Sequence, residues 1–274
     1  MTDSNGASPA RSLTTHDVRD HYNQFAWAYR RYWGDHIHHG LFLTGQEAPG
    51  EAQEQMLRYC AARGVVQPGM RVADVGCGHG ATANFLAREH SCHVLGLTIS
   101  EKQLKLARRL CRGLDGTTKF ELADAEAYAF PASSFDVIWN MESSEHFFDK
   151  AAYFRKVRAA IKPGGTLMVA AWTGSMRSPL VRNIAQVFLC PELWTTAEYV
   201  KQIESAGLRV LSSEQLASEV VRTWDLAAEQ IRRSRWLLSI LPAQFREFAR
   251  GVDLMREGFH SGQLTYSVIV AARG

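Results

Sequence analysis

The sequence predicts an α/β fold built on a doubly wound, mainly parallel sheet. Three observations support this prediction. Short apolar, β-branched segments alternate with helical segments over residues 68–173, which is the pattern of successive βαβ units. A turn with glycine at every second position, 76–80, directly follows the first of these strands. Charged and polar residues follow several strand ends, where open α/β sheets place their ligands.

The N-terminal half of the chain supplies four strands and four helices. Apolar or alternating patterns predict the strands at 72–75, 92–97, 118–122 and 135–140. Helical periodicity predicts the helices at 15–33, 47–63, 81–88 and 101–112. Thr15 is a suitable N-cap for the first helix, which has Asp17 in its first turn. Ser100 is the expected N-cap of the fourth helix, with Gln103 at the capping-box position.

The C-terminal half continues the alternation and then adds helices. A helix at 149–161 is expected to end at the Lys-Pro-Gly-Gly sequence 162–165, before a strand at 166–172. The last two strands are predicted at 208–213 and 263–272, and further helices at 175–190, 195–206, 217–240 and 244–259. The helices between the last two strands are expected to form a lid. Its Trp and Phe side chains either line a pocket for an apolar substrate or pack into the core of the lid.

The domain organisation follows from these elements. We expect a disordered tail over 1–14 and a single domain over 15–274. The domain divides into an N-terminal helical cap (15–65), a cofactor-binding core (68–173), lid helices with the sixth strand (174–262) and the last strand (263–274).

The composition limits the class of protein and its partners. A hydrophobic fraction of 46% and a charged fraction of 22% are those of a globular protein. The net charge of +3 provides little attraction for nucleic acid. No apolar run approaches the roughly 20 residues of a membrane span, and the polar start lacks a signal-peptide core. The five cysteines have no C-x-x-C spacing, which predicts reduced thiols in a cytoplasmic protein.

The glycine turn favours one class of cofactor. Its G-x-G-x-G spacing differs from the G-x-G-x-x-G of dinucleotide sites and from the P-loop, which carries a Lys. Asp74, on the strand before the turn, suits a cationic amino group better than a diphosphate, which a carboxylate would repel. Glycine also lets a ligand approach main-chain N–H groups closely. The pattern therefore favours S-adenosylmethionine over NAD or ATP, and the alternative is an ordinary αβ corner without a ligand.

Two further strand ends supply candidate partners for a nucleoside. Thr98 ends the second strand, where ribose-binding folds place an acid for the diol. Thr98 and Gln103 are therefore the expected ribose partners, and helix capping is the alternative role for both. Asp124 follows the third strand and is placed to accept a hydrogen bond from an adenine amino group. The alternative for Asp124 is a solvated acidic turn.

The fourth strand ends in a cluster of titratable residues. Glu142, Glu145 and His146 follow it directly and are candidate acid or base groups. The alternative role for either glutamate is a charge at a helix N-terminus.

Three histidines lie in a glycine-bounded loop at 34–40. His36, His38 and His39 have a His-x-His spacing that can bind zinc. No cysteine or carboxylate cluster of matching spacing accompanies them. We therefore expect no metal and assign these histidines to substrate contact or packing.

These motifs resemble class I S-adenosylmethionine-dependent methyltransferases over almost the whole chain, and most of all the γ-tocopherol methyltransferase family. Five stretches carry the resemblance: 33–40 looks like W-G-x-H-I-H-H-G, 74–80 is similar to the first motif, 96–103 looks like G-I-T-L-S-x-x-Q, 142–150 is close to E-S-G-E-H-M-P-D-K, and 190–194 resembles the lid segment. Ser144, Phe147 and Phe148 depart from the fourth of these patterns.

The resemblance implies a Rossmann-like, doubly wound, seven-stranded sheet whose last strand is antiparallel, with N-terminal helices and a helical lid. It also implies S-adenosyl-L-methionine as cofactor and S-adenosyl-L-homocysteine as product. The expected acceptor is a small, hydrophobic or aromatic molecule, either a tocopherol-like phenol methylated on carbon or an amine or hydroxyl of a specialised metabolite. Cyclopropane fatty acid synthases share T-L-S-x-x-Q and E-H-F, so alkene cyclopropanation is an alternative.

The family pattern also implies where each part of the cofactor binds. It assigns the methionine end to Asp74, Gly76 and Gly78, the ribose to Thr98 and Gln103, and the adenine to Asp124 and Ala125. Cys77 and Ile99 are expected to bind the cofactor as well. It further implies that Tyr22 and Trp33 close over the cofactor and that Asn140 borders the sulfonium.

For a phenolic acceptor, a base beside the hydroxyl removes its proton and enriches the ortho ring carbon. We assign that base to His146 or Glu142, with His38 or His39 as the second choice. The competing class is a protein that binds S-adenosylmethionine but binds or rearranges a hydrophobic metabolite without methyl transfer. A nucleic-acid methyltransferase is disfavoured because residues 140–143 lack the Asn-Pro-Pro-aromatic motif. We expect a monomer or a homodimer.

Overall fold

The structure is a computed structural model that describes residues 12–114, 116–233 and 243–274. Most of the tail predicted at 1–14, and the part of the helix predicted at 217–240 that follows residue 233, therefore lie outside the described residues. Within those ranges no helix combines the length and the apolar character that crossing a bilayer requires.

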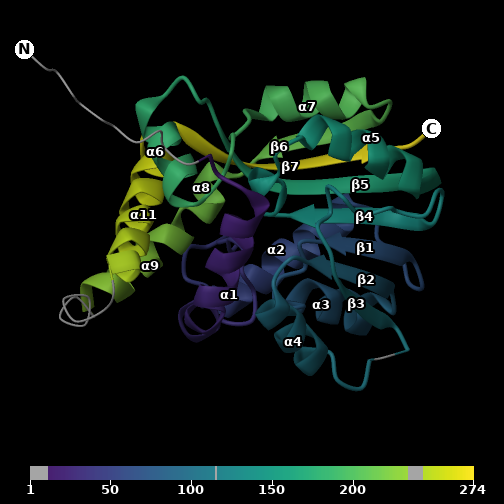
Figure 1. The fold of residues 1–274 in the computed structure, drawn as a ribbon, viewed down its shortest axis with the longest axis horizontal. Coiled ribbons are helices and arrows are strands. Elements are labelled where there is room, and N and C mark those ends of the chain that lie inside the picture. Colours follow the sequence, from purple (N-terminus) through teal and green to yellow (C-terminus); the bar gives the residue numbers. More distant parts are fainter. Residues whose placement is uncertain (1–11, 115, 234–242) are drawn as a thin grey trace, which may run out of the picture.

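A seven-stranded mixed sheet runs through the described part of the chain in the order β3-β2-β1-β4-β5-β7-β6 (Figure 1). The strands are β1 Arg71–Val75, β2 His93–Thr98, β3 Thr118–Leu122, β4 Phe135–Met141, β5 Ile161–Gly174, β6 Arg209–Gln215 and β7 Leu264–Ala272. Strands β1 to β5 pair in parallel, and β7 is antiparallel to both β5 and β6. The predicted fold class, including the antiparallel last strand, is confirmed.

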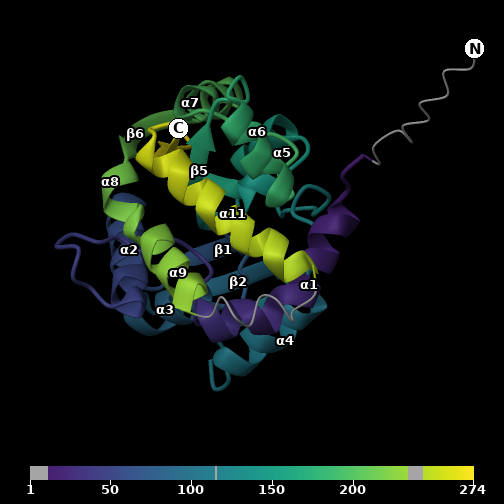
Figure 2. The same ribbon diagram turned by 90° about the vertical axis from the view of Figure 1, so that its left-hand side faces the viewer.

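Helices cover both faces of the sheet. They are α1 Thr15–Tyr32, α2 Pro49–Arg63, α3 Ala81–His90, α4 Glu101–Leu110, α5 Lys150–Ala160, α6 Pro179–Val187, α7 Thr196–Ser205, α8 Ala217–Val220, α9 Arg222–Arg233 and α11 Ala243–His260, with a 3₁₀ turn η1 at Ser144–His146. Helices α9 and α11 lie side by side as a lid, with α1 next to them (Figure 2).

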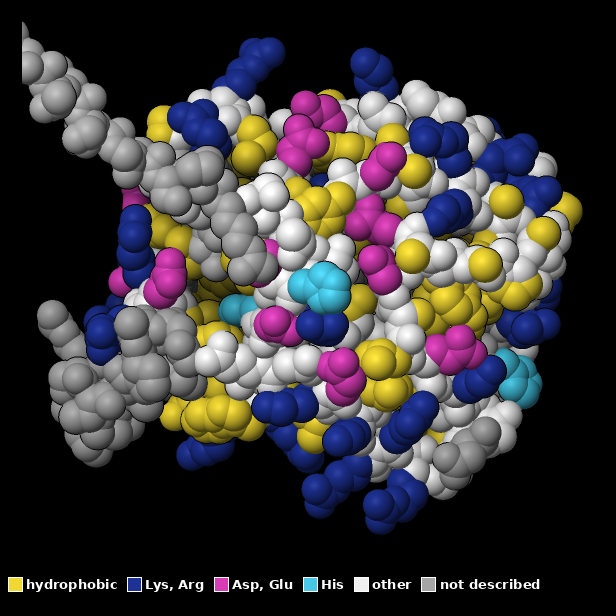
Figure 3. Space-filling view, in the orientation of Figure 1, with side chains coloured by type: hydrophobic (Ala, Val, Ile, Leu, Met, Phe, Trp, Pro, Cys, Tyr) yellow, Lys and Arg dark blue, Asp and Glu magenta, His cyan; other side chains and the backbone are white. Residues whose placement is uncertain are grey.

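Side-chain alternation along the strands separates two apolar cores. Val72 and Trp139 pack with α2, α3 and α4 and with the lid helices, whereas Ala73 and Ile138 pack with α5 and α7. This is the period-2 pattern of strands buried on both faces. On the face shown in Figure 3, charged side chains of both signs are mixed, and Lys and Arg gather along the side formed by α4.

Four predicted boundaries are wrong for identifiable physical reasons. The N-cap of α1 is Thr14 rather than Thr15, because Thr14 and Asp17 form a reciprocal capping box. Strand β5 begins at Ile161 rather than at 166, because residues 161–165 are held by pairing with β4 and by main-chain hydrogen bonds to Arg273. Helix α6 is shorter than the predicted 175–190, because Ser178 caps it and Pro179 opens it. The helix predicted from 217 is broken into α8 and α9 at Val221.

Candidate active site: two adjoining pockets

Two pockets adjoin at the carboxyl ends of the parallel strands. The larger one, the cofactor pocket, is lined by the glycine turn after β1, the ends of β2, β3 and β4, the start of α1 and the loop 35–38. Its empty volume of about 960 Å³ includes space open to solvent, and falls in the range of roughly 300–1,000 Å³ typical of small-molecule sites. The second, the aromatic pocket, shares Tyr22, Ile37, Glu142 and His146 with it.

The glycine turn forms the floor of the cofactor pocket. Gly76, Gly78 and Gly80 all adopt positive φ angles, of 76°, 51° and 83°, which L side chains adopt only with strain. A Cβ at Gly76 would collide with the side chain of Ser143, whose hydroxyl donates to the carbonyl oxygen of Val75 at 2.7 Å. The turn is therefore open to a ligand and closed to a side chain.

Asp74 provides an unsatisfied carboxylate in this pocket. The residue is 2% exposed, and its Oδ2 atom has no hydrogen-bond partner among the described residues. Burial raises the pKa of Asp74 to about 7. A buried, unpartnered carboxyl group is costly unless a ligand supplies the missing donor. The ammonium group of S-adenosylmethionine is a donor of the required charge, so the residues present fit this cofactor.

The predicted ribose and adenine partners also line the cofactor pocket. The Thr98 hydroxyl donates to Oε1 of Gln103 at 2.9 Å, and Ser100 rather than Thr98 caps α4. The Thr98 hydroxyl also accepts from the main-chain N–H of Ser100 at 3.2 Å, so Thr98 supports the start of α4 as well as lining the pocket. Asp124 and Ala125 line the same pocket, and Oδ1 of Asp124 accepts from the main-chain N–H of Glu126 at 2.9 Å.

Aromatic side chains from six segments form the second pocket. It is lined by Tyr22, Tyr29, Trp33, Ile37, His39, Glu142, His146, Trp172, Phe188, Trp224 and Phe248, and has an empty volume of about 480 Å³. The rings of Trp33 and Trp224 are 5.2 Å apart, and those of Phe188 and Trp224 are 5.9 Å apart. Such a lining suits a flat or apolar small molecule.

Tyr22 and His146 meet where the two pockets adjoin. The Tyr22 hydroxyl lies 2.9 Å from Nε2 of His146, and Nδ1 of His146 lies 3.2 Å from the carbonyl oxygen of Leu189. A carbonyl oxygen only accepts, so Nδ1 carries the ring proton and Nε2 accepts from Tyr22. Burial lowers the pKa of His146 to about 4 and raises the pKa of Tyr22. Near neutral pH both groups are therefore uncharged.

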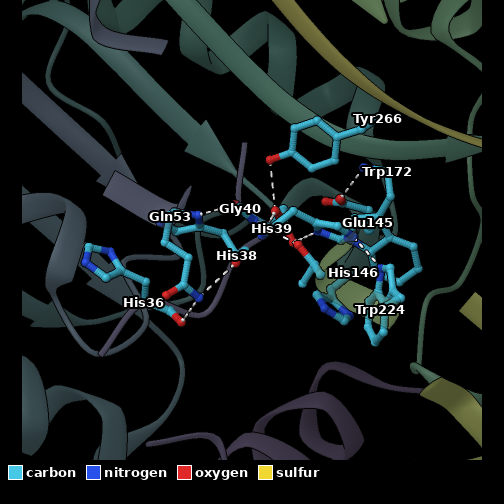
Figure 4. A network of polar contacts seen from close by, with 12 residues as sticks. His36, His38, His39, Gly40, Gln53, Glu145, His146, Trp172, Trp224 and Tyr266 are labelled. Atoms are coloured by element: carbon cyan, nitrogen blue, oxygen red, sulfur yellow. Dashed lines mark hydrogen bonds and ion pairs between the residues drawn. The ribbon is translucent and has the colours of Figure 1, made fainter. Parts of the chain in front are cut away.

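His39, labelled in Figure 4, forms a second polar pair with Glu142 at the wall of the aromatic pocket. Nδ1 of His39 lies 2.9 Å from Oε2 of Glu142, and the main-chain N–H of His39 donates to Oε1 at 2.7 Å. The Tyr266 hydroxyl donates to the same Oε1 at 2.8 Å, and the indole N–H of Trp224 donates to Nε2 of His39 at 2.6 Å. Burial would raise the pKa of Glu142, but its interactions with His39 outweigh burial and hold that pKa below its ordinary value.

The backbone of Glu142 is also unusual. Its φ of 49° lies in the left-handed region, which costs a non-glycine residue about 1–3 kcal/mol and is found mainly at functional sites. The hydrogen bonds that His39 and Tyr266 make to its carboxylate hold the residue in this conformation. Its carboxylate thus accepts three hydrogen bonds from two residues, two of them on Oε1 and one on Oε2.

Comparisons with known proteins agree with this geometry. The family model for mycolic acid cyclopropane synthetase matches residues 12–248. A probable chloroplastic tocopherol O-methyltransferase of Oryza sativa subsp. japonica is 25% identical over 276 residues, which cover 92% of this chain and 76% of that protein. The 27-O-demethylrifamycin SV methyltransferase of Amycolatopsis mediterranei is 30% identical over 244 residues, which cover 85% of this chain and 89% of that protein.

The chain belongs to the mycolic acid cyclopropane synthetase family. It is a class I S-adenosylmethionine-dependent methyltransferase related to enzymes that act on small molecules. The crystal structure of the cyclase SpnF shares the fold, with a TM-score of 0.84 at 22% identity over 96% of this chain and 97% of that one.

The structure of this methyltransferase brings most of the predicted site residues together. Ten predicted cofactor residues line the cofactor pocket: Tyr22, Asp74, Gly76, Cys77, Gly78, Thr98, Ile99, Gln103, Asp124 and Ala125. Three of the four predicted catalytic residues, His38, Glu142 and His146, line it too. Trp33 and Asn140 are the two predicted cofactor residues that do not line this pocket. Their roles as ligands stay predictions. His39 lines only the aromatic pocket.

Two predicted cofactor residues do not line the cofactor pocket. Trp33 lies eleven residues beyond Tyr22, about 16 Å along the helix axis, and it lines the aromatic pocket instead. The side chain of Asn140 donates to the Tyr153 hydroxyl at 3.3 Å and is fully buried. Its neighbour Met141 points the opposite way along β4 and lines the pocket.

Sequence reasoning missed two residues that hydrogen-bond to the His39–Glu142 pair. Trp224 and Tyr266 come from the lid and from β7, and nothing local in the sequence marks them as partners of His39 and Glu142. Glu145, which the sequence marked as a candidate acid or base, lines neither pocket. Its Oε1 accepts from the main-chain N–H of Trp172 at 3.0 Å, and burial raises its pKa to about 8.

The expectation that the loop histidines bind no metal stays a prediction. Among the residues that the structure describes, no group of three or more His, Cys, Asp or Glu side chains is arranged to hold a metal ion. His38 directs Nδ1 to the carbonyl oxygen of His39 at 2.9 Å, and burial lowers its pKa to about 4.

Proposed function

We propose that this enzyme methylates a neutral, hydroxylated aromatic molecule bound in the aromatic pocket. The observation that carries the proposal is the Tyr22–His146 pair, which lines both pockets and so lies between the two substrates. When bound, S-adenosylmethionine supplies an activated methyl group. The protein's part is to align the acceptor, remove its proton and exclude water.

The pair is arranged to take a proton from an acceptor hydroxyl. Tyr22 donates its own proton to Nε2 of His146 and can accept one from the acceptor in its place. The resulting imidazolium keeps its other N–H on the carbonyl oxygen of Leu189, and so both of its protons are bonded. Deprotonation serves methylation at the hydroxyl oxygen and at the ortho carbon alike.

The charges in the aromatic pocket favour a neutral acceptor over an amine. The Glu142 carboxylate is occupied by His39 and Tyr266. Glu145 lines neither pocket, and burial raises its pKa to about 8. Among the described residues that line this pocket, no free carboxylate is left to bind an ammonium group. The names of the two curated relatives, which describe methyl transfer to tocopherol and to a demethylrifamycin, support the same class of acceptor.

For the cofactor, we assign Asp74 to the ammonium group, the glycine turn to the methionine chain, Thr98 and Gln103 to the ribose, and Asp124 with Ala125 to the adenine. The support is that all of these residues line one pocket and that Asp74 lacks a partner among the described residues. Tyr22 closes this pocket from α1.

An acceptor panel tests the proposed function. The protein is incubated with methyl-labelled cofactor and either γ-tocopherol, a methylated hydroquinone, dimethylglycine, phosphoethanolamine or vesicles of an unsaturated phospholipid. Demethylated cofactor and labelled product are measured by mass spectrometry. Labelled γ-tocopherol or labelled hydroquinone supports the proposal. Label only in the amines refutes the choice of acceptor, and label only in the phospholipid favours the cyclopropanating alternative, for which the family's description is the supporting observation.

Two further predictions concern the cellular location and the oligomeric state. A cytoplasmic location is supported by the five cysteines, all of which are buried and unpaired. A monomer or a homodimer is expected, and light scattering of the purified protein distinguishes the two.

A further inference from the structure

A chain of buried hydrogen bonds connects the lid to the floor of the aromatic pocket. It runs from the indole N–H of Trp224 on α9 to Nε2 of His39, and from Nδ1 of His39 to the carboxylate of Glu142 at the end of β4. The side chains of His39 and Trp224 are 2% and 5% exposed. Figure 4 shows Trp224 and Tyr266 on opposite sides of this network, and the Tyr266 hydroxyl donates to Oε1 of Glu142.

The donors in this chain fix the protonation state of His39. An indole nitrogen can only donate, so Nε2 of His39 presents its lone pair to Trp224. The single ring proton therefore lies on Nδ1 and is donated to Glu142. A doubly protonated ring would set two N–H groups against each other across 2.6 Å. Both nitrogens of a neutral His39 are thus occupied, and neither is free to take a proton from an acceptor.

We propose that His39 is a positioning residue, which fixes the indole of Trp224 as a wall of the acceptor site. This inference rests on the proposed function, because it takes the aromatic pocket to be the acceptor site. Trp224 packs between Trp33 and Phe188 there, so a change in its tilt would alter the space available to an acceptor ring. In this proposal His39 does not act as the base.

The same loop is tied to the lid by bonds that do not involve His39. The main-chain N–H of Gly40 donates to the Thr223 hydroxyl at 3.0 Å, and that of Phe42 donates to the carbonyl oxygen of Glu219 at 2.8 Å. Removal of the indole N–H therefore leaves the loop attached to α8 and α9. A variant at Trp224 is expected to fold and to lose only the orientation of the ring.

Three variants separate positioning from proton transfer. His39→Gln places a carbonyl oxygen near the position of Nε2 and keeps an acceptor for Trp224, whereas His39→Asn places an amide N–H near Nδ1 and keeps only the donor to Glu142. Trp224→Phe keeps the ring and removes its N–H. None of the new side chains can act as a base.

Kinetics with γ-tocopherol as the acceptor give the first readout. We expect His39→Gln to keep kcat and the acceptor KM within about threefold of the wild-type values. His39→Asn and Trp224→Phe are expected to raise the acceptor KM about tenfold or more, with a smaller change in kcat. If His39→Gln and His39→Asn both lose kcat by 100-fold or more, His39 is a base and the proposal is overturned.

Nitrogen-15 NMR gives a second readout that needs no acceptor. The His39 ring should show a protonated Nδ1 and an unprotonated Nε2. Loss of one indole N–H signal in Trp224→Phe assigns that signal to Trp224. This N–H proton should exchange slowly with solvent in the wild type and in His39→Gln, and rapidly in His39→Asn. A charged His39 ring or the opposite tautomer overturns the proposal. If the wild type does not methylate γ-tocopherol, the proposed acceptor is wrong, and this NMR result still decides the state of His39.

Discussion

Cofactor affinity is expected to fall as the pH drops below about 7, because Asp74 then binds a proton. The ordinary pKa of an aspartic acid is 3.8, and burial raises that of Asp74 to about 7. The carboxyl group is therefore mostly protonated at pH 6 and ionised at pH 8, and only the ionised form attracts an ammonium group. With one competing proton, the apparent Kd at pH 6 is about tenfold weaker than at pH 8, and at pH 5 about 100-fold weaker.

Calorimetry with S-adenosylmethionine between pH 5.5 and 8.5 measures this effect. The difference in binding enthalpy between two buffers of different ionisation enthalpy also gives the number of protons released on binding. This number should be about one half per cofactor molecule at pH 7. Asp74→Asn removes the titrating group. The affinity of this variant for S-adenosylmethionine should be weaker than that of the wild type at pH 8, and it should lack the pH dependence that Asp74 causes. A wild-type affinity that is constant from pH 6 to pH 8, or an Asn variant with an unchanged pH profile, would refute the role of Asp74.

Three further predictions concern the proton relay, the glycine turn and the buried acid. Tyr22→Phe should lower turnover about 100-fold without a comparable loss of cofactor binding, whereas Tyr29→Phe, in the same pocket, should stay near wild type; equal losses would argue against a relay. Gly80→Ala should destabilise the fold by about 1–3 kcal/mol, because its Cβ would lie 2.8 Å from the Cβ of Ala107. In the matched control Gly113→Ala, φ is 86° and the added Cβ meets no atom within 4 Å, so this variant should lose only the stability that backbone strain costs. If chemical denaturation shows equal losses of stability for Gly80→Ala and Gly113→Ala, the clash with Ala107 is not the cause. Glu145→Gln should be increasingly stabilised relative to wild type as the pH rises from 5 to 8, by about 3–5 kcal/mol at most. The sign follows from a folded-state pKa of about 8 against an ordinary value of 4.5, because between these pH values the unfolded chain loses the proton that the folded protein keeps. A pH-independent difference in unfolding free energy would contradict it.

Much of the fold was predictable because local signals and tertiary structure agree. The β-branched runs, the glycine turn and the lid helices all have sequence patterns that match the observed elements. The residues after the strand ends lie together because parallel strands deliver their carboxyl ends to one edge. The start of β5 was not predictable, because its first residues are held by main-chain bonds to Arg273, far away in the sequence.

The misplaced site residues show what sequence patterns leave undecided. Asn140 and Met141 are adjacent at the end of β4, and strand alternation sends one to α5 and the other to the cofactor pocket. Trp33 lies on α1 with Tyr22, but the rise of the helix carries it into the neighbouring pocket. The bond between His39 and Trp224 joins residues 185 positions apart, so only tertiary packing reveals it.

The central claim is that the cofactor pocket and the aromatic pocket meet at Tyr22 and His146. A crystal structure of the complex with S-adenosylhomocysteine tests it most directly. We expect adenine beside Asp124, ribose against Thr98, and the sulfur atom facing the aromatic pocket next to the Tyr22 hydroxyl. Electron density for the ligand outside this pocket, or a sulfur atom turned away from Tyr22 and His146, would contradict it.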